Sequence, residues 1–503
     1  MKYQNPIISG FHPDPSICRV GEDFYLVNST FEYFPGIPVF HSKDLVNWTQ
    51  TGYCITEENA LLLEAGQPGC TGLFAPTIRY ADGVFYVICT NVGNDERDSG
   101  NFIVWSRNPE EGWSKPLYID TPGIDPSLFW DGDGTCYYIG THGSIYICKI
   151  NPMTGELLSE KTYIWEGTGG CYPEGPHIYK KDGWYYLMIS EGGTEYCHMV
   201  TMARSKEITG PYEAYEHNPV LTNRSLATTI KAVGHGDLVE DKDGNWWAVC
   251  LGIRPLSYPY RHNLGRETML VPVVWENGQW PQFGDGGTVL EEVNTDKITV
   301  MQKQKKGSYL DNFSKKELDL CWNFIYNPVP ELWEIQNQGL VLYGNENSLA
   351  DAKPIAWVGR RQEHHECIAM TQLTFDRKQN GEEAGFTIYM NNLHHYEAAL
   401  TKIDDRGYII FRRQIGTLWK IERQIPYERD QVVFELHCSK DHYTFWYGIS
   451  KDELKFLGKG ETDYLTTEVG GRFTGNYIGL YAAGNGVKCK EGAKFRWFKY
   501  TSK

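Results

Sequence analysis

The first 250 residues repeat one pattern, in which two apolar stretches are separated by a polar turn. In each copy a short alternating stretch leads into a Gly or Asp-Gly turn, and a stretch rich in Tyr, Phe and Trp follows. This is the pattern of a β-hairpin. The copies are DPSICRVGEDFYLVNS from Asp14, APTIRYADGVFYVICT from Ala75, DPSLFWDGDGTCYYIG from Asp125, GPHIYKKDGWYYLMIS from Gly175 and HGDLVEDKDGNWWAVC from His235. Their starts are 61, 50, 50 and 60 residues apart, and helical periodicity is nearly absent.

Further short strands are expected between the copies, for example in PVFHSKDLVNWTQ and NFIVWSRN. Each unit therefore has room for a small antiparallel sheet of about four strands, and radial repetition of such sheets forms a β-propeller. The pattern predicts a five-bladed β-propeller over residues 1–295.

The pattern changes after about residue 295. A polar, Lys-rich stretch containing QKQKKG predicts a linker over residues 296–310. Alternating strands such as EAGFTIYM, YIIFRRQ and HYTFWYG follow without the propeller period, which predicts a β-sandwich over residues 311–503. The expected fold class is all-β with two domains, since one hydrophobic core rarely grows beyond roughly 250–300 residues.

Composition narrows the classes of partner. The chain has 48 Lys and Arg against 64 Asp and Glu, a net charge of −16, with no long basic block. Nucleic acids and anionic membranes are bound through basic patches, so neither is expected as a partner. The sequence contains no run of eighteen consecutive apolar residues, so no membrane-spanning helix is expected.

The cysteines and the N-terminal residues indicate in which cellular compartment the protein is expected. The thirteen cysteines are scattered without zinc-ligand spacing, and their odd number is awkward for a disulfide framework. The N-terminus lacks the charged start and apolar run of a secretory signal. Reduced thiols in a cytoplasmic protein are therefore expected, and the substrate would then be small enough to be imported.

The repeat also predicts which polar residues meet. We aligned the copies on the first apolar strand residue, which is Ile17, Ile78, Leu128, Ile178 or Leu238. Three residues earlier the copies have Asp14, Ala75, Asp125, Gly175 and His235, and Glu174 precedes Gly175. Because the innermost strand of each blade starts near the propeller axis, the three acids and His235 are expected to face one pocket.

Three converging carboxylates are costly, since like charges repel and each carboxylate resists desolvation. A single Asp or Glu at a strand start is usually a turn residue or cap, but three at equivalent positions, two of them in a repeated Asp-Pro-Ser, favour a functional site. Such clusters separate pKa values, and hydrolysis of a glycosidic bond needs one basic and one acidic carboxyl. A calcium site is the competing interpretation, although the dense local ligand loop of such sites is missing.

The motifs NPIISGFHPDPSI, STFEYFPG, GLFAPTI, GIDPSLFWD, YPEGPHIY, VGHGDLVE and LGRET resemble glycoside hydrolase family 43, and most closely its β-xylosidases. The resemblance covers the whole chain. It implies a five-bladed propeller followed by a concanavalin-like β-sandwich, or jelly roll. It also implies an inverting exo-hydrolase that needs no organic cofactor and releases terminal xylose from short β-1,4-xylooligosaccharides. Relatives are often homo-oligomers.

The resemblance implies a role for each motif residue. Asp14 matches the general base that activates water, and Glu174 matches the general acid. Asp125 matches a third carboxylate that raises the pKa of the acid and orients it. Arg266 matches an arginine that holds substrate hydroxyls near the base, although a surface ion pair is the ordinary role of such a residue. His235 matches a histidine beneath the pocket that binds water or, in some members, a calcium ion; a buried structural histidine is the alternative.

Three phenylalanines match residues around the sugar subsite. Phe31 and Phe74 match its aromatic walls, and many relatives have Trp in place of Phe74. Phe473, in the predicted sandwich, resembles a residue that reaches across to close the pocket, with a role in the sandwich core as the alternative.

Three rival functions stay open on sequence alone. An α-L-arabinofuranosidase, or a bifunctional enzyme, fits the same fold, because terminal xylopyranose and arabinofuranose can present similar hydroxyl groups. A retaining fructan-type hydrolase is also a five-bladed propeller, but its acid follows a local pattern other than PEGPH. The third is a non-catalytic carbohydrate-binding propeller, against which the presence of both Asp14 and Glu174 argues.

Overall fold

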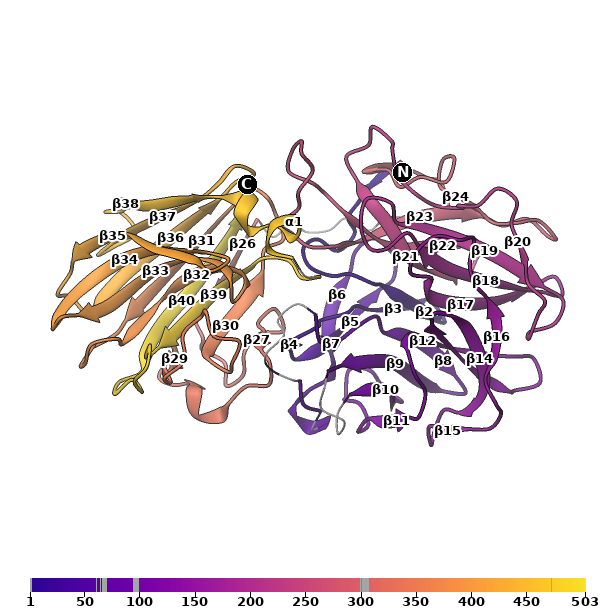
Figure 1. Ribbon diagram of the computed structural model, residues 1–503, viewed down its shortest axis with the longest axis horizontal. Coiled ribbons are helices and arrows are strands. Elements are labelled where there is room, and N and C mark those ends of the chain that lie inside the picture. Colours follow the sequence, from indigo (N-terminus) through magenta and orange to yellow (C-terminus); the bar gives the residue numbers. More distant parts are fainter. Residues whose placement is uncertain are drawn as a thin grey trace.

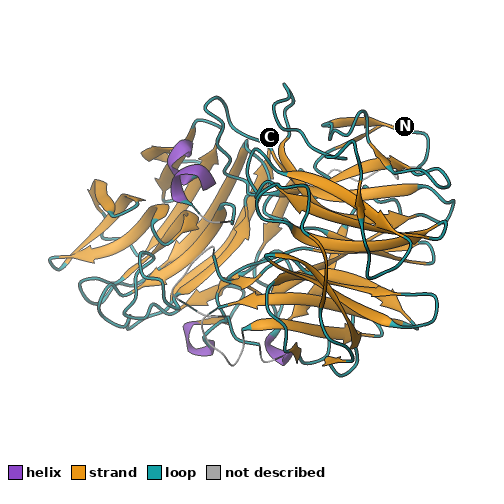
Figure 2. Cartoon of the chain, turned by 45° about the vertical axis from the view of Figure 1, so that its right-hand side comes forward, coloured by secondary structure: helices purple, strands orange, loops and turns teal. Residues whose placement is uncertain are grey.

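The computed structural model describes residues 2–59, 61–63, 65, 70–93, 99–298, 300, 307–471 and 473–503. Two bodies of β-structure lie side by side (Figure 1), and strands make up nearly all of the regular structure (Figure 2). The described helical segments are η1 (Glu57–Asn59), η2 (Pro330–Leu332), η3 (Thr462–Leu465) and α1 (Thr467–Gly470). Each of these helices is too short to span a bilayer.

Among the described residues, the N-terminal body contains five antiparallel sheets of four or five strands, which confirms the predicted five-bladed propeller. Blade 1 comprises β2 (Ser16–Val20), β3 (Asp23–Val27), β5 (Gly36–Ser42) and β6 (Thr49–Ile55). Blade 2 comprises β7 (Gly72–Leu73), β8 (Thr77–Ala81), β9 (Val84–Val92), β10 (Gly100–Ser106) and β11 (Leu117–Ile119). Blade 3 comprises β12 (Ile124–Trp130), β13 (Cys136–His142), β14 (Ser144–Asn151), β15 (Glu156–Leu157) and β16 (Thr162–Trp165). Blade 4 comprises β17 (Glu174–Lys181), β18 (Trp184–Glu191), β19 (Met199–Ser205) and β20 (Glu213–Ala214), and blade 5 comprises β21 (Lys231–Glu240), β22 (Trp246–Ile253), β23 (Glu267–Val274) and β24 (Gln282–Phe283).

The five repeated hairpins supply the innermost strands of the blades. Their first strands contact one another in a ring, β2 with β8, β8 with β12, β12 with β17, β17 with β21, and β21 with β2. The N-terminal strand β1 (Lys2–Gln4) pairs with β25 (Glu292–Asn294), which follows blade 5. The start of the chain is therefore attached to the last blade, which helps to close the ring.

A buried ion pair connects four blades near the propeller axis. Asp237 of blade 5 accepts hydrogen bonds from Ser16 Oγ at 2.6 Å, Tyr179 Oη at 2.6 Å and Arg79 Nη1 at 2.7 Å. Burial raises the pKa of Asp237, but the charges of Arg79 and His177 and the hydrogen bonds from Arg79 and Ser16 together hold this pKa well below its usual range. The centre of the propeller is thus fixed by a charge pair whose hydrogen bonds come from blades 1, 2 and 4.

The C-terminal body is a two-sheet sandwich, as predicted. One sheet comprises β26 (Ser308–Asp311), β28 (Trp333–Ile335), β29 (Leu340–Leu342), β31 (Cys367–Thr374), β36 (Gln431–Cys438), β37 (His442–Gly448), β38 (Lys455–Glu461) and β40 (Ala493–Ser502). The other comprises β30 (Ala356–Arg361), β32 (Glu383–Asn391), β33 (His394–Ile403), β34 (Arg406–Ile415), β35 (Leu418–Pro426) and β39 (Tyr477–Ala483). Alternating residues such as Phe386, Phe434 and Phe445 fill the space between the sheets. Residues 299 and 301–306 of the predicted linker lie outside the described part of the chain, and the domain boundaries stay predictions.

The sandwich is attached directly to blade 1. Strand β4 (Tyr33–Phe34) pairs with β27 (Phe324–Ile325), so one short ladder joins the two domains. The Tyr33 ring stacks on Tyr477 of the sandwich with centroids 4.0 Å apart. Arg361 Nε of the sandwich donates a hydrogen bond to the carbonyl of Phe11 at 2.7 Å. These contacts bring the sandwich next to the segment that carries Asp14 and Phe31.

Candidate active site

Four of the five equivalent repeat positions share an unusual backbone conformation. Asp14, Asp125, Gly175 and His235 have φ of 50°, 52°, 56° and 45°, which is the left-handed region. Residues other than glycine seldom adopt this region, and such strain concentrates at functional sites. Register shifts follow these positions in blades 3, 4 and 5. The residues at these four repeat positions therefore share a backbone conformation, which orients their side chains, as well as a similar distance from the propeller axis.

Asp14 is buried and held by partners from two other segments. Its Oδ1 accepts a hydrogen bond from Arg266 Nη1 at 2.8 Å, and its Oδ2 accepts one from Ser29 Oγ at 2.5 Å. His235 Nδ1 lies 4.0 Å from the same Oδ1. Burial raises the pKa of Asp14, but Arg266, His235 and the Ser29 hydrogen bond together hold it below its ordinary value. Asp14 is consequently an ionised carboxylate at neutral pH, as a general base must be.

Asp125, Glu174 and His235 form a tight cluster, in which each residue offers one atom and these atoms lie within 4.8 Å of one another. Asp125 and His235 are buried, whereas the Glu174 side chain is 19% exposed and so reaches the open part of the site. Burial, together with the neighbouring carboxylates of Glu174 and Asp14, raises the pKa of Asp125 well above its ordinary value. The structure thus brings together the four residues that the repeat predicted to converge, and Asp125 is in the environment of a protonated carboxyl.

This cluster is a poor calcium site as it stands. Calcium takes about six to eight oxygen ligands, whereas Asp125, Glu174 and His235 offer two carboxyl groups and an imidazole. Binding of calcium through water at His235 therefore stays a prediction. Burial also lowers the pKa of His235, and its backbone N–H donates to Ser190 Oγ at 2.6 Å.

Arg266 combines one charge partner with unused donors. Its Nη1 donates to Asp14 Oδ1 and to Thr194 Oγ1, the latter at 3.1 Å. Its Nε and Nη2 are buried and have no hydrogen-bond partner among the described residues. Buried donors are normally paired, so these two are suited to hydroxyl groups of a ligand beside Asp14.

Three phenylalanines form an aromatic wall beside these groups. Phe31 and Phe74 have ring centroids 5.0 Å apart, and Phe473 of the sandwich stacks on Phe31 at 5.6 Å. The Arg266 guanidinium lies 5.6 Å from the Phe31 centroid and 5.7 Å from that of Phe473. Phe473 therefore reaches across to Phe31 of the propeller, and it also packs against a cluster that includes buried aromatic residues of the sandwich.

Sequence reasoning missed three residues of the site. Ser29 and Thr194 hold Asp14 and Arg266 as described above, and His198 Nε2 lies 3.6 Å from Glu174 Oε1. None occupies the repeat position that carries the acids, so the alignment of the copies could not single them out. They lie at strand ends in the same blades, at Ser29 just after β3 and at Thr194 and His198 between β18 and β19.

The sequence matches two families over most of its length. Residues 3–281 match Glycosyl hydrolases family 43. Residues 310–501 match the Beta xylosidase C-terminal Concanavalin A-like domain.

Individual relatives match along the whole chain. A non-reducing end alpha-L-arabinofuranosidase of Bacteroides ovatus is 38% identical, with 99% of this chain and 94% of the relative covered. A xylosidase/arabinosidase of Butyrivibrio fibrisolvens is 36% identical, with 98% of each chain covered. The crystal structure of a xylan beta-1,4-xylosidase of Bacillus halodurans has a TM-score of 0.92 at 31% identity, with 99% of this chain and 100% of that chain covered.

Proposed function

The chain belongs to glycosyl hydrolase family 43, and from this premise we propose that it is an inverting exo-β-xylosidase that releases terminal xylose from short β-1,4-xylooligosaccharides. The observation that carries the proposal is the unlike environment of its carboxyls. Asp14 is ionised beside Arg266, whereas the pKa of Asp125 is raised next to Glu174. A site with one basic and one proton-holding carboxyl position is what hydrolysis of a glycosidic bond requires.

Asp14 and Glu174 carry the chemistry in this proposal. Asp14 takes a proton from a water molecule as the water oxygen attacks the anomeric carbon. The bond from that carbon to the glycosidic oxygen breaks at the same time, and Glu174 transfers its proton to the departing oxygen. Burial and the neighbouring carboxylates of Glu174 and Asp14 raise the pKa of Asp125, which favours a protonated carboxyl at that position. Inversion needs about 6.5–9.5 Å between base and acid to admit water.

The remaining residues bind and orient the sugar. Nε and Nη2 of Arg266 donate to ring hydroxyls, and the faces of Phe31 and Phe74 pack against the apolar face of the pyranose. Phe473 narrows the site from the sandwich side. A site closed below by the propeller axis and on one side by a second domain favours a chain end over the middle of a chain, which supports exo action.

An α-L-arabinofuranosidase is the second candidate, alone or as an additional activity. The Bacteroides ovatus relative that carries this name is 38% identical over nearly the whole chain. Phe74 also gives a smaller aromatic surface than Trp would, which weakens any argument for strict xyloside preference.

Product release from xylobiose, nitrophenyl β-xyloside and nitrophenyl α-arabinofuranoside tests the proposal. We expect the xylosides to be cleaved faster, and Asp14→Ala and Glu174→Ala each to abolish turnover of xylobiose. Preference for the arabinofuranoside would keep the mechanism and change the substrate. Cleavage of none of the three would overturn the proposed function.

Inversion is tested by proton NMR of the first product. We expect α-xylose to form from the β-linked substrate before mutarotation. Initial formation of β-xylose would mean a covalent intermediate and would refute the inverting assignment.

We further propose that the enzyme acts in the cytoplasm on imported saccharides. All thirteen cysteines belong to the described part of the chain, and each is a free thiol, which supports a reducing compartment. Fractionation of the producing cell, followed by the xyloside assay, is the test, and activity confined to the culture medium would refute it. Homo-oligomerisation stays a prediction, and light scattering of the purified protein tests it.

A further inference from the structure

His198 is a buried histidine in the site with unused hydrogen-bonding groups. It directly precedes β19, and its side chain has no solvent exposure. Neither Nδ1 nor Nε2 has a hydrogen-bond partner among the described residues. Buried polar atoms are normally paired, and a retained exception calls for an explanation by function or by a missing partner.

Two hydrogen bonds hold the backbone of His198, and its ring packs against Gly234. The backbone N–H of His198 donates to the carbonyl of Glu195 at 3.0 Å, and its carbonyl accepts from Thr222 Oγ1 at 2.9 Å. The ring lies on the backbone of Gly234, where a Cβ atom would come within 2.3 Å of Cε1 and 2.4 Å of both nitrogens. The imidazole therefore occupies space that only a glycine at position 234 leaves open.

The carboxylate beside Nε2 of this ring belongs to the proposed proton donor. His198 Nε2 lies 3.6 Å from Glu174 Oε1, just beyond hydrogen-bond distance. Catalytic hydrogen bonds are often long without substrate and tighten in the complex. The other ionisable groups that face the ring are His235 and Asp14, both within electrostatic range.

We propose that His198 is a positioning residue for the proton donor, whose Nε2–H hydrogen-bonds Glu174 Oε1 when a saccharide is bound. This hydrogen bond leaves Oε2 of Glu174 to carry the proton and turns it toward the glycosidic oxygen. His198 itself exchanges no proton with the substrate. The inference rests on the proposed function and adds a residue to it.

Leaving-group dependence separates this role from a structural one. Xylobiose has a sugar hydroxyl as leaving group, which needs a proton, whereas 2,4-dinitrophenyl β-xyloside releases a weakly basic phenolate that does not. General acid catalysis contributes roughly 10²–10⁴-fold. We therefore expect His198→Asn to lower kcat/KM for xylobiose about 10- to 100-fold more than for the dinitrophenyl substrate. Glu174→Ala is the reference and should show the same selectivity more strongly.

Matched variants locate the effect on one ring nitrogen. The amide nitrogen of Gln can occupy the place of Nε2, whereas that of Asn lies nearer to Nδ1. His198→Gln should thus recover part of the xylobiose activity that His198→Asn loses. Gly234→Ala keeps the imidazole but displaces it, and should reproduce the selectivity of His198→Asn. His177→Asn is the control, because His177 is equally buried but its Nδ1 lies 2.9 Å from Arg79 Nη2 on the axis; it should leave the ratio between substrates unchanged.

The outcomes separate the two proposals. Equal losses on both substrates in His198→Asn and Gly234→Ala, with the expected selectivity in Glu174→Ala, would overturn the role of His198 alone. If His198→Asn does not fold, the ratio of kcat/KM for xylobiose to kcat/KM for the dinitrophenyl substrate is measured in His198→Gln and Gly234→Ala instead, and it decides in the same way. A wild-type protein that cleaves no xyloside or arabinofuranoside would overturn the proposed function and this inference together.

Discussion

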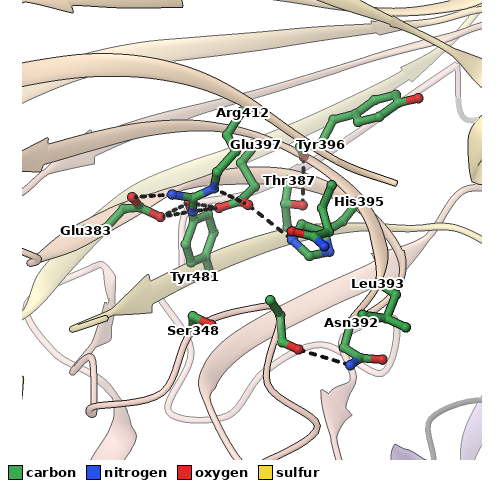
Figure 3. A network of polar contacts seen from close by, with 12 residues as sticks. Ser348, Glu383, Thr387, Asn392, Leu393, His395, Tyr396, Glu397, Arg412 and Tyr481 are labelled. Atoms are coloured by element: carbon green, nitrogen blue, oxygen red, sulfur yellow. Dashed lines mark hydrogen bonds and ion pairs between the residues drawn. The ribbon is translucent and has the colours of Figure 1, made fainter. Parts of the chain in front are cut away.

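Each domain buries a group of carboxylates around one arginine, and the two groups differ in how completely they are paired. In the propeller, Arg266 contacts Asp14 and leaves two donor groups unused, while Asp125 and Glu174 repel each other. In the sandwich, Glu383 and Glu397 lie on either side of Arg412 in Figure 3.

The sandwich group is a closed network. Arg412 Nη2 donates to Glu383 Oε1 and to Glu397 Oε2, both at 2.5 Å, and its Nε donates to Glu397 Oε1 at 2.9 Å. Tyr481 Oη donates toward the same two carboxylates at 2.8 and 2.5 Å. Both ring nitrogens of His395 also have oxygen partners, one of them on Glu397. Burial raises the pKa of both glutamates. Arg412 and His395 together outweigh burial at Glu397, whose pKa lies well below its usual range, whereas burial and the charge of Glu397 keep the pKa of Glu383 above its ordinary value despite Arg412.

The difference between the groups indicates their use. A cavity of about 450 Å³ borders the sandwich network, yet the charged groups of that network are paired with one another. A satisfied network makes a fold rigid, whereas unpaired donors and repelling acids destabilise a fold and are retained for binding or catalysis. Loss of an acid should therefore cost activity in the propeller and stability in the sandwich.

The largest expected effect is on turnover, for Glu174→Gln. The amide keeps the shape of the side chain but cannot donate the acid proton. We expect kcat/KM for xylobiose to fall by about 10³–10⁴-fold, with no loss in the midpoint of thermal unfolding, because Glu174 is partly exposed and lacks an arginine partner among the described residues. A variant within tenfold of the wild type would exclude Glu174 as the proton donor.

The opposite result is expected for Glu397→Gln. Removing one charge from a buried ion pair leaves Arg412 incompletely paired, which costs about 3–5 kcal/mol. Chemical denaturation should show this loss, while kcat/KM of the folded protein stays close to wild type. Glu422→Gln is the matched control on the same sheet, because Glu422 pairs with Arg413 at 2.6 Å at the surface; it should cost about 1 kcal/mol or less. Equal costs in the two variants would contradict the distinction between closed and surface pairs.

The repeat explains why much of this could be predicted from sequence. Hairpins that recur every 50 to 61 residues determine the blades, because a strand pattern with a turn is local information. Asp14, Asp125 and His235 occupy the aligned position and Glu174 precedes it, so a single alignment brings them to one place. Their left-handed backbone was not predictable from residue type, since Asp and His adopt this region more often than most residues but still at a minority of positions.

The rest of the site depends on contacts that no local pattern encodes. Arg266 and Phe473 were identified only by family resemblance, because they lie outside the repeat and Phe473 comes from the other domain. Thr194 and His198 lie beside residues that are distant in sequence, at positions 266 and 174. The closed network of the sandwich was not predicted at all, since Glu383, Glu397 and Arg412 read as ordinary polar positions of alternating strands.

The third-largest effect is expected for Arg266→Gln, on kcat/KM and on its pH dependence. Loss of its donors should lower kcat/KM by about 10²–10³-fold. Asp14 must be ionised to act as base, and the positive charge of Arg266 opposes the effect of burial on the pKa of Asp14. Without that charge this pKa rises, so the acidic limb of the pH profile should move to higher pH. Arg266→Lys keeps the charge and should keep the limb near its wild-type position; a shift as large as that of Arg266→Gln would argue against this electrostatic role.

A smaller effect is expected for Phe473→Ala, which opens the propeller site on the sandwich side. Loss of an aromatic face of this kind costs about 1.5–3 kcal/mol when it is fully used. We expect KM for xylobiose to rise about tenfold, which corresponds to 1.4 kcal/mol, with a smaller change in kcat. Steady-state kinetics on xylobiose measures both constants. A fall in kcat with KM unchanged would instead mean that Phe473 acts on the chemical step.

The smallest expected effect is a gain in stability in Asp125→Asn, which is opposite in sign to the loss expected for Glu397→Gln. The pKa of Asp125 is raised in the folded protein, so the unfolded chain releases a proton more readily, and folding is penalised at pH values above the unfolded pKa of about 3.8. The amide removes this penalty and should raise stability by about 1 kcal/mol at neutral pH. The gain should disappear as the pH falls well below the unfolded pKa of about 3.8, where both states hold the proton. Denaturation at the two pH values measures the difference. A loss of stability at neutral pH would place Asp125 with the paired carboxylates of the sandwich, because only a favourable partner for its charge could make the removal of that charge costly.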